Sequence, residues 1–400
     1  RLAVVDAEEL KILSLRRFSG SGIRGMAPSL DGGELFLAHN RIFSYNPTSQ
    51  PMVFYGFVVS SGILALRVDN LLDPNRAGPI HQYGFHPLGE VKAGAGDPGS
   101  FLFTRDGQVA VCLSGVNQVA IGGELRQELI RVKVGRRPVA LAETLGGSLL
   151  VANYFDDSIS VIDPLKRRVV RTLFLNGKPR STPAREGEIL FHDAGVSLHG
   201  WFSCHSCHVD GHTTGGMADT MGDGTILTPK RITSLLGTAK SGPWGWDGSK
   251  NELHAQVLQS MQLTMQGAEM KKDTPGNAAS IVAYLQTLQN PVPIDVARGV
   301  LDKQAFARGG QVFRKQDCSE CHQPGLYTSE KVFDVGLRDE RGLRKFNPPS
   351  LRGLSHRERL LHDNRLNSLE ALLGDLGHPD GRTLLEGRQL QDLLYYLRNL

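Results

Sequence analysis

The stretch Cys204-His205-Ser206-Cys207-His208 decides how this chain is interpreted, and Cys318-Ser319-Glu320-Cys321-His322 repeats its pattern. A Cys-x-x-Cys-His pentad is the attachment signature of c-type haem, in which both thiols bind the vinyl groups and the histidine binds the iron. We therefore expect two covalently bound haems. Their attachment residues are Cys204, Cys207, Cys318 and Cys321, and the axial ligands of the irons are His208 and His322.

A zinc site and a redox dithiol are the alternative explanations of such cysteine pairs. Paired zinc motifs usually lie about 15–20 residues apart, whereas much more of the chain separates Cys207 from Cys318. Neither pair follows a βαβ pattern of the thioredoxin type. Haem attachment is the interpretation that fits both pentads.

The composition is that of an ordinary globular protein, with 40% hydrophobic and 22% charged residues among 400. A net charge of +4 without any basic run predicts no nucleic-acid partner. No apolar run approaches the ~20 residues of a membrane helix. The fifth cysteine, Cys112, lies in an apolar strand-like stretch and is expected to be a buried thiol.

The haem motifs also predict where the protein is found. Covalent haem attachment in bacteria takes place outside the cytoplasmic membrane, so we expect a periplasmic or exported protein. The sequence begins at Arg1 without a signal peptide. Either the signal has been removed or the chain is the later part of a longer protein.

Residues 1–180 are predicted to form short β-strands, because glycine, proline and β-branched runs dominate there. A turn followed by an apolar strand begins at Asp31, Asp106 and Gly146. The interval between Asp106 and Gly146 has the length of one propeller repeat, which is about 40–45 residues. The wider first interval predicts a degenerate unit between Asp31 and Asp106. A β-sandwich is the alternative fold.

The clearest repeat runs from Val134 to Leu175 and contains four strand-like segments, as one propeller blade requires. It resembles the β-propeller repeats of bacterial surface proteins in Val151-Ala152-Asn153 and in Ser158–Asp163. The opening Leu2–Asp6 is similar to the third strand of such a blade. About 180 residues suggest four to five blades, which we interpret as part of a truncated seven-bladed ring.

Beyond the β region, helices and long loops are expected. Apolar residues at helical spacing predict helices at Glu252–Gln266, Ala278–Leu288 and toward Leu400. Asn290–Pro293 is a stiff break between domains. The fold class is thus multidomain β plus α, with a β-propeller at 1–180 and two mainly α cytochrome c-like domains at 181–293 and 294–400.

Further motifs accompany the pentads in a fixed order. They are Gly187–Asp193, Phe202–Cys204, Trp246-Asp247-Gly248 with Gln256, Pro349–Arg352, Leu361–Asp363 and Ser368–Glu370. In this order they resemble the motifs of the di-haem cytochrome c peroxidase family, which includes the MauG-type enzymes, over about half of the chain. The resemblance implies that one haem meets hydrogen peroxide and that the other stores or delivers electrons.

The resemblance also implies roles for side chains near the first haem. Trp246 would be an electron relay between the haems, with core packing as the alternative, and Gln256 would belong to the same site. The family's catalytic glutamate is replaced by Gln266, which cannot act as a general base. Glu269 is the nearest carboxylate that could take that role.

The sequence departs from the family pattern at two further places, the distal ligand of the second haem and the calcium ligands between the domains. Where the family has Met or Tyr this chain has Leu376, so His378 is the candidate distal ligand, with a surface histidine as the alternative. The family's calcium ligands correspond to arginines, which repel a cation, so no calcium is expected. Arg231, Arg357 and Arg359 are instead candidates for pairing with haem propionates or for contacts between the domains.

Two functions from different classes fit these features. The first is an exported di-haem oxidoreductase of the cytochrome c peroxidase/MauG type, which uses hydrogen peroxide together with a small electron-donor or substrate protein. The second is a non-catalytic di-haem electron-transfer cytochrome with the propeller as its docking module. In a further version, the propeller is the functional binding module and the haems relay electrons to what it binds.

Overall fold

The structure, a computed structural model, describes residues 2–18, 20–73, 84–125, 127–175, 177, 181–267, 274–379 and 384–400. The chain divides into two compact units. Unit 1 comprises residues 1–182, 189–209 and 265–271, and unit 2 comprises 183–188, 210–264 and 272–400. The first pentad therefore belongs to unit 1, together with the β region. The predicted domain boundaries near 180 and 293 remain predictions.

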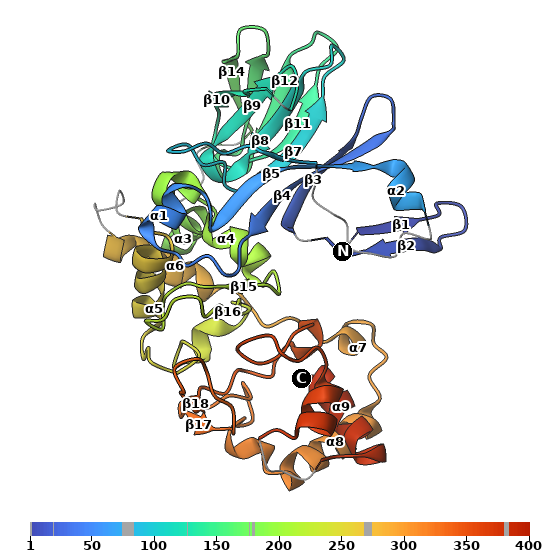
Figure 1. The fold of residues 1–400 in the computed structure, drawn as a ribbon, viewed down its shortest axis with the longest axis vertical. Coiled ribbons are helices and arrows are strands. Elements are labelled where there is room, and N and C mark those ends of the chain that lie inside the picture. The colour runs from blue at the N-terminus through green and yellow to red at the C-terminus, as the bar shows by residue number, and fades with distance from the viewer. Residues whose placement is uncertain are drawn as a thin grey trace. The chain divides into compact units, whose positions relative to one another are not determined.

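Unit 1 contains three four-stranded antiparallel sheets, each with its strands in chain order (Figure 1). The first has β3 (Ser21–Pro28), β4 (Glu34–Ile42), β5 (Val59–Arg67) and β6 (Phe85–Pro87). The second has β7 (Pro98–Phe103), β8 (Val109–Leu113), β9 (Gln118–Gly122) and β10 (Ile130–Lys133). The third has β11 (Pro138–Glu143), β12 (Leu149–Asn153), β13 (Ser158–Asp163) and β14 (Arg168–Phe174), while β1 (Leu2–Val5) pairs with β2 (Ile12–Arg16).

The second sheet is buried on both faces, as β8 shows most clearly. Val111 and Leu113 pack in a core with Phe36 and Ile63 of the first sheet. The alternate residues of β8 pack in a separate core with Leu149 and Ile162 of the third sheet. Since neighbouring strand residues point to opposite faces, both neighbouring sheets cover this strand, which explains its continuous apolar run. Consecutive sheets stacked in this way resemble propeller blades rather than a two-layer sandwich.

The predicted blade is confirmed in its four strands, β11 to β14. The predicted degenerate unit between Asp31 and Asp106 is wrong, because the first sheet itself occupies that interval. Two inserted helices, α1 (Gln50–Phe54) and α2 (Val68–Leu72), separate its strands and lengthen the repeat. The described residues accordingly form three four-stranded sheets rather than four to five blades. Closure into a ring remains a prediction.

The rest of the chain is helical with long loops. Its helices are α3 (Pro183–Phe191), α4 (Cys204–Cys207), α5 (Leu253–Gln259), α6 (Thr274–Leu285), α7 (Ile294–Ala297), α8 (Lys303–Lys315) and α9 (Gly387–Arg398). The predicted helix at Glu252–Gln266 is observed as α5 followed by a π-helical turn at Ser260–Thr264. Among the described residues, no helix has the length and apolar character to cross a membrane.

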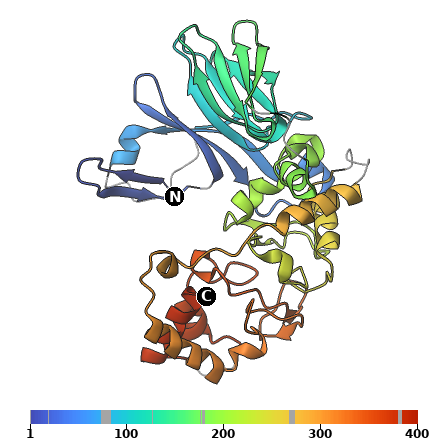
Figure 2. The same cartoon turned by 180° about the vertical axis from the view of Figure 1, so that it is seen from behind.

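Helices α8 and α9 lie side by side in unit 2 (Figures 1 and 2) and form its main apolar core. Phe313 of α8 packs there with Leu393 and Leu394 of α9, both fully buried. The helices approach most closely at Gly309, where an added Cβ would lie 2.1 Å from the carbonyl oxygen of Asp392. Only glycine fits this crossing without a shift of the backbone.

We expect Gly309→Ala to lower the free energy of unfolding by roughly 1–3 kcal/mol, since overpacking against backbone forces the helices apart. Urea unfolding of the holoprotein followed by circular dichroism measures the change. Gln311→Ala, on the exposed face of the same helix, is the matched control, with an expected change within about 0.5 kcal/mol. Equal stabilities of the Gly309→Ala variant and the wild type would contradict the packing described here.

Candidate haem sites

Both pentads adopt the same local geometry, a single turn. The backbone N–H of His208 donates to the carbonyl of Cys204 at 2.9 Å, and that of His322 donates to the carbonyl of Cys318 at 2.9 Å. Residues three and four apart lie on one side of such a turn. Each turn therefore presents its two cysteines and its histidine together, as covalent haem attachment requires.

The second pentad also has its ligand oriented. His322 Nδ1 lies 3.0 Å from the carbonyl oxygen of Tyr327, which can only accept, so Nδ1 carries a proton. Burial lowers the pKa of His322 and favours the neutral imidazole. A neutral ring held by a backbone carbonyl is the usual arrangement of a metal-binding histidine.

The two alternative explanations of the first pentad fit its surroundings less well. Burial and the nearby Asp97 raise the pKa of Cys204 and of Cys207 to about 12. A reactive redox dithiol needs the opposite shift. Within the described ranges, no group of three or more His, Cys, Asp or Glu side chains could hold a metal ion. Thioether attachment to haem needs no thiolate in the mature protein.

Trp246 lies in unit 2 between a cation and an aromatic ring. The guanidinium carbon of Arg231 is 5.2 Å from the centre of its indole ring, and the His362 ring is 6.2 Å away in an edge arrangement. The backbone of Trp246 accepts a hydrogen bond from Asn347 N at 3.0 Å. His362 itself stacks on Phe346 at 4.9 Å. The tryptophan thus joins segments on both sides of the second pentad.

Arg231 and Arg357 are two cations of unit 2 that have no carboxylate partner among the described residues. Arg231 is 7% exposed and donates through Nε to the carbonyl of Leu361 at 3.0 Å. Burial lowers its pKa to about 10, and burial together with Arg231 does the same for Arg357. Both remain charged at neutral pH, so an anionic group nearby would stabilise them. The carboxylates of a haem propionate have the chemistry to do so, whereas Arg359 is exposed.

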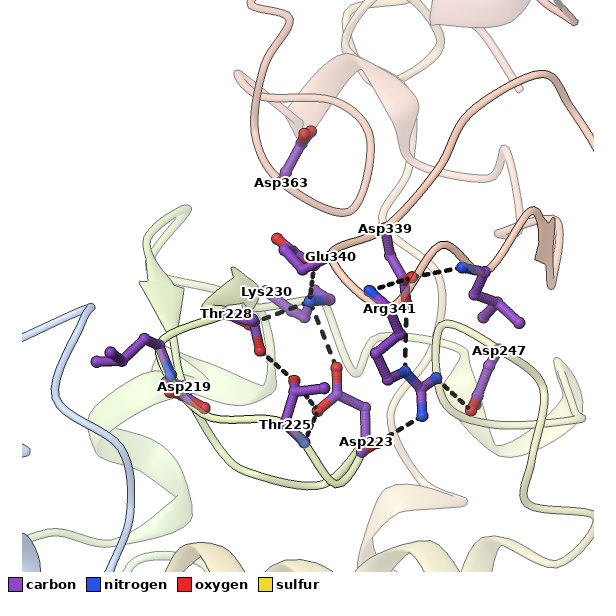
Figure 3. A network of polar contacts seen from close by, with 12 residues as sticks. Asp219, Asp223, Thr225, Thr228, Lys230, Asp247, Asp339, Glu340, Arg341 and Asp363 are labelled. Atoms are coloured by element: carbon purple, nitrogen blue, oxygen red, sulfur yellow. Dashed lines mark hydrogen bonds and ion pairs between the residues drawn. The ribbon is translucent and has the colours of Figure 1, made fainter.

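A polar network in unit 2 joins the segment after the first pentad to the segment after the second (Figure 3). Lys230 Nζ lies 2.6 Å from Glu340 and 3.4 Å from Asp223. Arg341 donates to the carbonyl of Asp223 at 2.6 Å and lies 3.6 Å from Asp247, the neighbour of Trp246. The network therefore fixes the loop that carries Trp246.

The other predicted residues are placed as follows. Gln256 Nε2 donates weakly to Ser260 Oγ at 3.4 Å in unit 2. Gln266, in unit 1, donates through Nε2 to the carbonyl of Thr48 at 2.9 Å. His378 is half-buried in unit 2. Glu269 lies outside the described residues.

The residues missed by the sequence reasoning are Asp97, Lys230, Arg341 and Tyr327. None belongs to a pentad or a family motif. Each contacts residues that are distant in sequence or forms its contact through a backbone carbonyl, so the roles of these residues are visible only in the folded structure. Met265 Sδ lies 3.9 Å from Cys204 Sγ, and Met265 is a core residue with 3% of its surface exposed.

Residues 184–295 match the family model of the di-haem cytochrome c peroxidases. Over 235 residues the chain is 29% identical to the methylamine utilization protein MauG of Methylorubrum extorquens, covering 47% of this chain and 66% of that protein. Over 278 residues it is 24% identical to hydrazine synthase subunit gamma of Kuenenia stuttgartiensis, covering 55% and 78%. A hydrazine synthase structure from that organism superposes with a TM-score of 0.49 at 23% identity, covering 56% and 89%. The resemblance of the C-terminal half to the di-haem cytochrome c peroxidase family is confirmed.

We expect Lys230→Met to destabilise the protein by roughly 1–3 kcal/mol at neutral pH, because it leaves the partly buried Asp223 and the more exposed Glu340 without their cation. Burial opposes ionisation of Asp223, but hydrogen bonds from Thr225 and the charge of Lys230 leave its pKa below the usual value. The stabilisation is therefore present above the unfolded pKa of about 3.9 and is lost as pH falls through the folded value.

Urea titrations of the wild type and the variant at neutral and acid pH test this. The stability difference should narrow below about pH 4. Lys11→Met is the matched control, since Lys11 and Glu9 form an ion pair with side chains 72% and 61% exposed, worth about 0–1 kcal/mol. A Lys230→Met effect as small as that of the control would contradict the prediction.

Proposed function

We propose that the chain is an exported or periplasmic di-haem c-type oxidoreductase of the cytochrome c peroxidase/MauG type. The observation that carries the proposal is the common geometry of the two pentads, each a single turn that presents two cysteines and a histidine. The family match over residues 184–295 and the surroundings of His322 support it. The haem-attachment residues are then Cys204, Cys207, Cys318 and Cys321, with His208 and His322 on the irons.

Haem, when bound, supplies an iron that exchanges electrons with hydrogen peroxide at one pentad and with a donor or acceptor at the other. Reduction of hydrogen peroxide to two waters takes two electrons and two protons, and a small electron-donor protein is the source of the electrons. His322 would hold the second iron. Arg231 and Arg357 would neutralise haem propionates, and Trp246 would relay electrons between the haems.

Proton transfer to peroxide needs a carboxylate or imidazole near the first haem. Gln266 cannot take a proton at neutral pH, and its amide is already donated to Thr48. We therefore assign the proton-transfer role to a group other than Gln266, with Glu269 as the candidate. In the MauG-type version of this reaction, a partner protein replaces the electron donor and is itself the substrate that is oxidised.

The alternative is a non-catalytic di-haem electron-transfer cytochrome. The loss of the glutamate at position 266 favours it. In that case both irons carry two protein ligands, with His378 at the second, and the β region is a docking module. The two functions differ in whether one iron is open to peroxide.

Electron paramagnetic resonance and optical spectra of the holoprotein distinguish them. For the oxidoreductase we expect two covalent haems and a high-spin ferric signal that is lost on adding one equivalent of hydrogen peroxide. Two low-spin haems that ignore peroxide, in both the oxidised and the half-reduced protein, would overturn the peroxidase function and leave the carrier.

We expect Trp246→Phe to slow electron transfer between the haems by about tenfold or more, a change of at least ~1.4 kcal/mol in the barrier. Stopped-flow reduction of one haem by the other measures the rate. Trp244→Phe is the matched control, because Trp244 is a tryptophan of the same loop whose indole N–H donates to the carbonyl of Thr238 at 3.0 Å. Equal rates in the two variants would assign Trp246 to packing only.

A further inference from the structure

Asp97 stands at the centre of a buried polar cluster in unit 1. Its Oδ1 accepts from Ser206 Oγ at 2.6 Å and from Asn40 Nδ2 at 2.8 Å. Its Oδ2 accepts from Ser203 Oγ. Asn40 is held in turn by Ser61 Oγ at 2.9 Å. Ser206 lies inside the first pentad and Ser203 directly precedes it, whereas Asn40 and Ser61 belong to β4 and β5.

The same carboxylate faces the histidine inside the pentad. Asp97 Oδ2 lies 3.8 Å from His205 Nδ1, and a guanidinium nitrogen of Arg24 lies 3.2 Å from His205 Nε2. A guanidinium only donates, so Nε2 accepts and the ring proton faces Asp97. His205 is 3% exposed. Its side chain is thus committed to the β region and leaves His208 as the pentad's iron ligand.

Burial would raise the pKa of Asp97, but its contacts with His205, Ser203 and Ser206 outweigh this and hold the pKa well below the usual range. The carboxylate is therefore ionised at neutral pH although it is only 8% exposed. Such a charge is tolerated in an interior only when donors surround it. Four groups surround the carboxylate here. Ser203, His205 and Ser206 belong to the first pentad and the residue before it, and Asn40 belongs to β4.

We propose that Asp97 is a positioning residue for the first haem: it fixes the Cys204–His208 turn to the β region, and its buried negative charge lowers the reduction potential of that haem. A fixed negative charge near the iron stabilises the ferric over the ferrous state, and burial weakens the screening of that charge. The inference rests on the haem assignment of the proposed function. It also makes the β region part of the haem site rather than a separable docking module.

Asp97→Asn in the exported holoprotein tests the proposal, because asparagine keeps the shape and removes the charge. Redox titration followed by optical and paramagnetic resonance spectra should show one of the two midpoint potentials shifted upward and the other unchanged. Asp31→Asn is the matched control, since Asp31 lies in an exposed turn of the same unit and accepts hydrogen bonds from its neighbours Ser29 and Gly33. Unchanged potentials, equal shifts of both, or a downward shift would overturn the proposal.

A second variant covers the case in which Asp97→Asn does not accumulate. Ser206→Ala keeps the carboxylate and removes one hydrogen bond to it. We expect faster hydrogen exchange at residues 203–208, with exchange at 318–322 unchanged, and less haem on the peptide that contains Cys204 and Cys207. Exchange and haem content equal to the wild type would overturn the positioning role.

Failure of this inference is distinct from failure of the proposed function. If the wild-type protein carries no haem on the first pentad, the function fails and the variants have no haem to report on. If haem is present and Asp97→Asn and Ser206→Ala leave potentials, exchange and haem content unchanged, only the role of Asp97 is excluded.

Discussion

A buried, ionised carboxylate is the constraint on which unit 1 depends. Asp97 keeps its charge only because Asn40 approaches from a strand while Ser203, His205 and Ser206 approach from the turn of the first pentad. Removing any of these groups leaves part of a charge without compensation, which is far more costly than losing an exposed contact. The turn and the sheet are therefore stabilised together. The β region shapes the first pentad directly, and the pentad in turn completes the interior of the β region.

In unit 2 the comparable constraint is an excess of buried positive charge. Lys230 and Arg341 are matched by carboxylates, so they join the segments that follow the two pentads around the loop of Trp246. Arg231 and Arg357 donate hydrogen bonds to carbonyl oxygens, and Arg231 also lies against the ring of Trp246. The same unit thus contains two cations that pair with carboxylates, Lys230 and Arg341, and two, Arg231 and Arg357, that an added anion would stabilise. The propionates of a haem would turn the second pair into structural contacts as well.

The sequence predicted what is encoded locally. Each pentad lies on a single turn, and strands β11 to β14 follow the four strand-like segments of the repeat between Val134 and Leu175. The repeat count failed because α1 and α2 lengthen one repeat without changing its strands. Asp97 was not predictable, because its partners lie near residues 40 and 205, and a lone aspartate before a strand has no distinctive spacing. Arg231 was found only through the family resemblance, and its stacking on Trp246 depends on the tertiary fold.

The two pentads share a motif but differ in how deeply the residues between their cysteines are buried. In the second, Glu320 between the two cysteines is exposed to water, so its side chain is not fixed in the interior of the protein. In the first, His205 and Ser206 are buried against Asp97. A segment carrying the first pentad could not be moved to another protein unless the recipient offered a matching carboxylate at the same place. The residues between the cysteines of the second pentad carry no such requirement.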